Sequence, residues 1–222
     1  MDTSRRGSVV GDNSLDPSGL TRRPIAARSS GWAKRLAGRL AASSVTPNQI
    51  SLLSCVFSLL GGALILWPNG WASWVGAAIC IQLRLVCNLL DGMVAVEGGK
   101  ASPVGVLYNE FPDRVSDSLL LVPVGYAVGY PWLGWCAALL AALTAYVRVF
   151  GGALGQAQDF SGIMAKQRRM ALLTLGALAQ AGESAFSPTR YSMLAAGLLI
   201  AAGSAITCGT RTIAIARRLG AG

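Results

Sequence analysis

The sequence predicts an all-α integral membrane protein with six transmembrane helices and an N-terminal amphipathic helix at the membrane interface. Of the 222 residues, 53% are hydrophobic, and the mean hydropathy is +0.50. Only 13% are charged, whereas a soluble domain carries about 25%. Six apolar stretches approach the length of about 20 residues that a helix needs to cross a bilayer. Much of the protein surface is therefore expected to face lipid.

Three segments follow from these patterns. Residues 1–30 contain Arg, Gly, Ser and Pro but no apolar run, and are expected to form a disordered basic cytoplasmic arm. Residues 31–44 combine cationic and apolar positions at helical spacing, which is typical of an interfacial amphipathic helix. Residues 45–222 are expected to form a six-helix membrane catalytic domain. Its expected spans are 51–67, 72–90, 106–128, 132–150, 170–182 and 191–208.

Residues with known turn and cap preferences support these limits. Thr46 suits the N-cap of the first span, and Pro47 suits its first turn. Gly129-Tyr130-Pro131 is a turn signal between the third and fourth spans. Pro112 lies in the third expected helix, where it either bends the helix or marks a later start.

The basic residues predict how the protein is oriented. The net charge is +9, and eight Lys and Arg residues precede the first span. Most of the others lie in alternate loops, so both termini and the loops after the second and fourth spans are expected in the cytoplasm. A multi-pass protein of the plasma (inner) membrane is predicted. Because of the apolar runs, the basic residues are expected to contact an anionic membrane surface, and no nucleic acid is expected as a partner.

The acidic residues concentrate in one short segment. Five of the ten lie between positions 91 and 117. Asn109, Asp113 and Asp117 stand four apart and share a helix face, while Asn88 and Asp91 stand three apart on the preceding helix. Since the chain has no histidine, such oxygen ligands favour a hard cation, Mg²⁺ or Mn²⁺, over zinc. Alternatively, the acids lie in the headgroup layer and pair with nearby basic residues: Arg84, Lys100 and Arg114.

At these positions the chain resembles the CDP-alcohol phosphatidyltransferases, whose signature is D-x2-D-G-x2-A-R-x8-G-x3-D-x3-D. All spacings match over 26 residues. Three positions depart from the signature, because Asn88 and Asn109 replace aspartates and Val96 replaces the arginine. The sequence reads Asn88-x2-Asp91-Gly92-x2-Ala95-Val96-x8-Gly105-x3-Asn109-x3-Asp113.

The resemblance implies an enzyme of phospholipid biosynthesis. It would transfer a phosphatidyl or related group from a CDP-linked lipid donor to a small alcohol acceptor and release CMP. By position, the metal ligands for two Mg²⁺ or Mn²⁺ ions would be Asn88, Asp91, Asn109 and Asp113, with Asp117 added as an extra acid on the same face. Asp113 would be the catalytic base, with Asp117 as the second candidate. Donor binding is assigned to Gly92, Ala95, Glu97 and Gly105.

A second cluster, Arg148, Lys166 and Arg169, is similar to the acceptor-phosphate pocket of family members that use a phosphorylated alcohol. Positive-inside topology alone also accounts for these residues. The acceptor remains open among inositol phosphate, glycerol phosphate, serine and others. A homodimer is expected from the family and from small-residue pairs such as Gly61-Gly62.

Two other functions compete with this one. A catalytically degenerate member would keep the fold, with a metal site weakened by Asn88 and Asn109. A small membrane transporter or scaffold would use the acids as an ion site. An ion path would spread its acids across the bilayer midplane, whereas these acids gather at one end.

Overall fold

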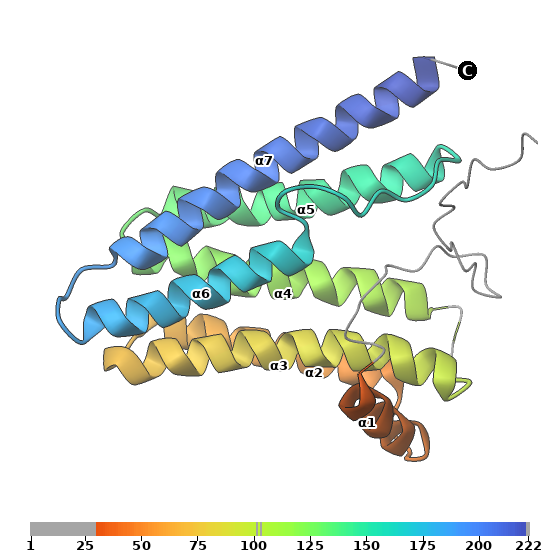
Figure 1. Ribbon diagram of the computed structural model, residues 1–222, viewed down its shortest axis with the longest axis horizontal. Coiled ribbons are helices and arrows are strands. Elements are labelled where there is room, and N and C mark those ends of the chain that lie inside the picture. The colour runs from red at the N-terminus through yellow and green to blue at the C-terminus, as the bar shows by residue number, and fades with distance from the viewer. Residues whose placement is uncertain (1–29, 101, 103, 221–222) are drawn as a thin grey trace, which may run out of the picture.

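The computed structural model describes residues 30–100, 102 and 104–220, and their regular secondary structure is entirely helical (Figure 1). The predicted arm at 1–30 falls outside these residues except for Ser30. The helices are α1 (Gly31–Ala41), α2 (Pro47–Leu66), α3 (Gly70–Glu97), α4 (Gly105–Ala127), α5 (Pro131–Ala153), α6 (Lys166–Ser184) and α7 (Tyr191–Gly220).

Helices α2 to α7 form an elongated bundle, and α1 lies across one end of it (Figure 1). Among the described helices, four are long and apolar enough to cross a membrane: α2, α3, α5 and α7. Helices α4 and α6 pack among these four, but charged side chains lower their hydropathy. The all-α membrane class is confirmed, while the count of six spans stays a prediction.

Helix α1 has the amphipathic character that its sequence predicts. Ala33 and Ala37 are fully buried, while Lys34, Arg35 and Arg39 are exposed. The buried alanines pack in a cluster with residues of α2 and α3, among them Ile50, Leu90 and Val94. One apolar stripe therefore anchors α1 to the bundle and leaves its cations in contact with the surroundings.

The predicted cap and turn are confirmed. Thr46 forms a capping box with Gln49: the Thr46 hydroxyl accepts from the Gln49 amide at 3.3 Å, and the Gln49 side chain accepts from the Thr46 amide at 2.9 Å. Gly129 has a φ of 81°, a left-handed conformation that favours glycine. These local signals fix where α2 begins and where the chain turns between α4 and α5.

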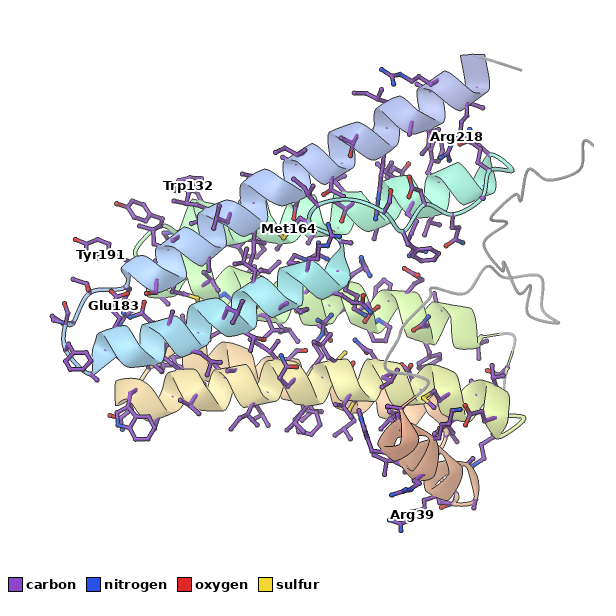
Figure 2. The ribbon with its side chains drawn as sticks, viewed as in Figure 1. Arg39, Trp132, Met164, Glu183, Tyr191 and Arg218 are labelled. Atoms are coloured by element: carbon purple, nitrogen blue, oxygen red, sulfur yellow. The ribbon has the colours of Figure 1, made fainter. Side chains whose placement is uncertain are left out.

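Glu183 fixes the opposite end of the bundle, where α6 passes to α7 (Figure 2). Its carboxylate accepts from the amides of Tyr191 at 2.9 Å and Ser192 at 2.8 Å, and from the Thr189 hydroxyl at 2.5 Å. Burial opposes the ionised form, but these hydrogen bonds hold the pKa of Glu183 at about 2. The carboxylate thus satisfies the first amides of α7.

Several helices run beyond the apolar spans that the sequence predicts. Helix α3 continues to Glu97, α7 reaches Gly220, and α6 begins at Lys166, which agrees with the expectation that the short span 170–182 extends at one end. The apolar residues end where the charged ones begin, but Lys, Arg, Gln and Glu are good helix formers, so the helical backbone continues. Helix α4 runs from Gly105 through Pro112, so the alternative of a helix start at Pro112 is wrong.

Small residues let the helices approach one another closely. A Cβ on Gly62 of α2 would lie 2.1 Å from the Leu119 carbonyl oxygen of α4. A Cβ on Gly125 of α4 would lie 2.5 Å from the Gly134 amide nitrogen of α5. Both distances are far shorter than real contacts, so α4 packs backbone to backbone against its two neighbours.

Gly62→Ala is expected to destabilise the bundle by about 1–3 kcal/mol, because α2 and α4 must move apart. The measurement is the thermal unfolding midpoint in detergent. Gly182→Ala is the matched control, because a Cβ there meets nothing within 4 Å. Equal midpoints for the two variants would contradict the close contact.

Candidate active site

Four helices bring polar and charged side chains together in the half of the bundle nearer α1. Asn88 and Asp91 lie on α3, while Asn109, Asp113 and Asp117 lie on α4. The spacings of three and four place each set on one helix face. Helix α6 contributes the predicted cations Lys166 and Arg169 from its first turn, and α5 contributes Arg148.

Asp117 is the most deeply buried acid of this cluster, with 1% of its surface exposed. Its Oδ1 accepts from Arg84 Nη2 of α3 at 2.6 Å, and its Oδ2 accepts from Arg169 Nη2 of α6 at 2.6 Å. Both guanidinium groups are also fully buried. Asp117 therefore joins three helices through one carboxylate, and both of its oxygens are occupied.

Asp113 lies one turn earlier on α4 and is more accessible. Its Oδ2 binds the Lys166 ammonium, and the Arg114 guanidinium lies 3.6 Å away. Arg84 approaches its Oδ1 at 3.7 Å. The Asp113 side chain keeps 11% of its surface exposed, so a ligand can reach it.

Asp91 is held from a different side. Its Oδ2 accepts from the Ser51 hydroxyl of α2 at 2.7 Å, and its Oδ1 accepts from the Gly92 amide at 2.6 Å. Asp113 is linked to the same helix by Arg84, which stands two turns before Asp91 on α3 and whose Nη2 lies 3.7 Å from Asp113 Oδ1. The two carboxylates of the signature thus face one region, as the spacing predicts.

The donor set in this region fits a hard cation in chemical type. Asp91 and Asp113 supply carboxylates, and Asn88 supplies an amide whose Nδ2 is buried without a partner. Asn109 is exposed one turn before Asp113. In the described part of the chain, no three Cys, Asp or Glu side chains converge as a metal site of acids alone would require.

The residues assigned to the donor lie along the end of α3 and the start of α4. Gly92 and Ala95 are half-buried on α3, and Glu97 is exposed at its last turn. Gly105 is the first residue of α4. Gly92 directly follows Asp91, and Gly105 stands one turn before Asn109.

Arg148 makes a separate set of contacts at the cytoplasm-facing end predicted for α5. Its Nη2 donates to Glu110 Oε1 at 2.5 Å, and its Nη1 donates to Gln158 Oε1. The guanidinium also lies 5.0 Å from the centre of the Phe160 ring. Arg148 therefore links α4 and α5 to the segment before α6.

Three residues of this cluster were not predicted as part of the site. Arg84 and Arg114 were expected only as alternative ion-pair partners of the acids, and no role was predicted for Ser51. Arg84 is the sole charged residue within the expected span 72–90. A lone cation in an apolar helix is expensive and therefore usually functional or paired, and that signal could have identified it.

No family model matches the chain. A phosphatidylinositol phosphate synthase of Streptomyces avermitilis is 27% identical over 184 residues, which cover 78% of this chain and 73% of that protein. An archaetidylinositol phosphate synthase of Aeropyrum pernix is 30% identical over 147 residues, covering 66% of this chain and 74% of that protein.

The chain belongs to the CDP-alcohol phosphatidyltransferase family. Solved structures show the same fold. Mycobacterium tuberculosis phosphatidylinositol phosphate synthase with CDP-DAG bound gives a TM-score of 0.71 at 19% identity, over 84% of this chain and 94% of that chain. The same enzyme in complex with manganese and citrate gives 0.70, over 82% and 88%.

Family membership confirms the predicted enzyme class, a CDP-alcohol phosphatidyltransferase of phospholipid biosynthesis. It counts against a transporter or scaffold, whose acids would not need the signature spacing. It also agrees with the gathering of Asp91 and Asp113 between α3 and α4, since the signature connects these two helices.

Asp117→Asn is expected to lower the free energy of unfolding by about 3–5 kcal/mol, because a buried guanidinium loses its counter-charge. Thermal and denaturant unfolding in detergent measure this loss. Glu97→Gln removes an exposed acid at the end of α3 and serves as the control. If Asp117→Asn unfolds like the control, the three-helix ion group does not stabilise the fold.

Proposed function

We propose that this enzyme transfers a phosphatidyl or related group from a CDP-linked lipid to inositol phosphate, with release of CMP. The observation that carries the choice of acceptor is Lys166 beside Asp113, which places a phosphate-binding cation next to a candidate base. The relatives' names, phosphatidylinositol phosphate synthase and archaetidylinositol phosphate synthase, support a phosphorylated inositol.

A divalent cation would be held by the carboxylates of Asp91 and Asp113, with the amide oxygens of Asn88 and Asn109 as neutral ligands. When bound, such an ion neutralises the departing CMP and polarises the attacked phosphorus. The relative that is complexed with manganese supports divalent binding. The expectation of two ions comes from the resemblance. The proposed donor residues Gly92, Ala95, Glu97 and Gly105 border this place.

Asp113 is the proposed base. The acceptor oxygen attacks the phosphorus that carries the lipid, its proton passes to the Asp113 carboxylate, and the bond to CMP breaks. Lys166 occupies Asp113 Oδ2 in the structure. An acceptor phosphate offers Lys166 a second anion, so acceptor binding would free the oxygen that takes the proton. Asp117 could serve as ligand or base only after leaving Arg84 and Arg169.

The proposed acceptor site differs among its three predicted cations. Lys166 has a flexible ammonium and lies beside the base. Arg169 is committed to Asp117 and to the Met164 carbonyl, and so orients its neighbours. Arg148 is bound to Glu110 and Gln158 and would join the phosphate only by exchanging these partners.

The proposed placement has six spans in the plasma (inner) membrane, with the active site at the cytoplasmic surface. Arg39 of α1 and Arg218 of α7 lie toward the same end of the molecule (Figure 2), as cytoplasmic termini require. Helix α1 would lie at the interface with its exposed cations on anionic lipid. A homodimer is part of the same proposal, but the pair expected to form it, Gly61-Gly62, is buried against α3 and α4 within the bundle and does not supply the dimer surface.

The purified enzyme is expected to release CMP from CDP-diacylglycerol and inositol phosphate only with Mg²⁺ or Mn²⁺. Asp91→Ala and Asp113→Ala should each lower the rate by at least 100-fold, because each removes a charged ligand or the base. Asp159→Asn, an acid outside the cluster, is the control. No metal-dependent release with any phosphorylated or free alcohol would favour the catalytically degenerate alternative.

Lys166→Gln is expected to raise KM for inositol phosphate by about 10- to 100-fold, since a hydrogen bond to a charged group contributes about 1.5–3 kcal/mol. Arg168→Gln is the matched control: it removes the same charge from the same turn of α6, but Arg168 is exposed and donates to the Gly162 carbonyl. Equal KM values for the two variants would contradict acceptor binding by Lys166. They would favour the alternative that these basic residues only set the orientation of the protein in the membrane.

A further inference from the structure

The signature positions of this chain carry half the negative charge that the family pattern supplies. Asp91 and Asp113 are carboxylates, while Asn88 and Asn109 are neutral amides. Oxygen from an amide can coordinate a cation but does not offset its charge. The site therefore has to neutralise the same substrate diphosphate with a different arrangement of charges.

The additional acids of the segment do not replace the missing charge. Both oxygens of Asp117 are taken by buried arginines. Glu110 pairs with Arg148 at 2.5 Å and approaches Arg114 at 3.9 Å. Glu97 is exposed at the last turn of α3. Within the described residues no three acidic or thiol groups converge, so the donor set is poor for two divalent ions.

The same region contains an excess of hydrogen-bond donors. Seven buried side-chain N or O atoms lack a partner in the described part of the chain, and five of them are nitrogens of site residues. They are Arg84 Nε, Arg84 Nη1, Asn88 Nδ2, Arg114 Nε and Arg169 Nε. Buried N–H groups without acceptors are costly, so these donors favour an anionic ligand.

Arg84 is the strongest of these donors. Its side chain is completely buried on α3, one helical turn before Asn88 and two before Asp91. Only Nη2 is engaged, by Asp117 and by the Asp113 carbonyl oxygen at 3.4 Å. Two of its three guanidinium nitrogens, Nε and Nη1, thus lack an acceptor although both are buried, so a ligand that pairs with them has to displace neighbouring side chains. The guanidinium supplies a permanent positive charge at this position.

We infer that this enzyme binds one divalent ion, at Asp91 and Asp113, and that the guanidinium of Arg84 takes the place of a second ion in neutralising the donor diphosphate. This inference rests on the proposed function. It makes Arg84 a substrate-binding residue. It also explains why asparagines stand at positions 88 and 109, because aspartates there would attract a second cation into a site that already contains an arginine.

The number of bound ions is measured directly by titrating the intact enzyme in detergent with Mn²⁺ and counting bound Mn²⁺ by electron paramagnetic resonance. About one ion per chain is expected for the wild type and about two for the double variant Asn88→Asp, Asn109→Asp, because the restored carboxylates permit a second site. Asn69→Asp at the other end of α3 is the control and should match the wild type.

Two ions in the wild type, or one ion in the double variant, would overturn the inference. CMP release is assayed on the same samples. A wild type that binds two ions and releases CMP leaves the proposed function intact and removes only this inference. A wild type that binds no Mn²⁺ and releases no CMP removes both.

The role of Arg84 is tested by the affinity for CDP-diacylglycerol at saturating Mn²⁺. Arg84→Gln should weaken binding by about tenfold or more in the wild type, but by less than about threefold in the Asn88→Asp, Asn109→Asp background, where the second ion compensates. Equal losses in the two backgrounds would overturn it. If Arg84→Gln does not fold, Arg84→Lys retains the charge but loses the fork of donors, and unchanged affinity in that variant would also overturn it.

Discussion

The buried ion group of Arg84, Asp117 and Arg169 is the interaction on which the rest of the site depends. Taking a charge out of water costs several kcal/mol even after relaxation. Here one carboxylate serves two guanidinium groups at 2.6 Å each. Because the three residues come from three helices, the group sets how α3, α4 and α6 stand relative to one another. Asp113 lies one turn from Asp117 on α4, and Lys166 lies one turn from Arg169 on α6, so the same ion group also fixes the positions of Asp113 and Lys166.

The charges of the site also explain why two helices of the bundle do not resemble membrane spans. Helix α4 carries the acids and α6 begins with the cations, so their hydropathy is low. They remain in the bundle because each packs against more apolar helices, α4 against α2 and α5, and α6 against α3 and α7, and because small residues permit close backbone contact. The charged side chains of α4 and α6 pair inside the bundle, so few of them are exposed to lipid. This pairing lowers the cost of placing a polar site within the bilayer.

Much of this arrangement could be predicted from local patterns. Apolar runs located the helices, Thr46 and Gly129 marked a cap and a turn, and the spacing of Asp91, Asp113 and Asp117 placed them on facing helices. Arg84 and Arg114 could be named as possible partners of the acids, but which acid each one contacts could not be predicted, because the pairing depends on how α3 rotates against α4 and α6. Arg84 and Asp117 are 33 residues apart, and no periodicity links them. Asp117 therefore looked like a ligand, although the structure pairs it with arginines.

The net charge of the site determines which substrate group it can bind. Two divalent ions about 4 Å apart repel by roughly 17 kcal/mol at an effective dielectric constant of about 20, so a pair requires several carboxylates close by. This chain presents two at the signature positions. The ion pairs of the wider cluster contain five cations: Arg84, Arg114, Arg148, Lys166 and Arg169. Against four acids, Asp91, Glu110, Asp113 and Asp117, the cluster is positive before any metal binds. A diphosphate is the ligand that such a site lacks, because it supplies both negative charge and acceptors for the unpaired N–H groups.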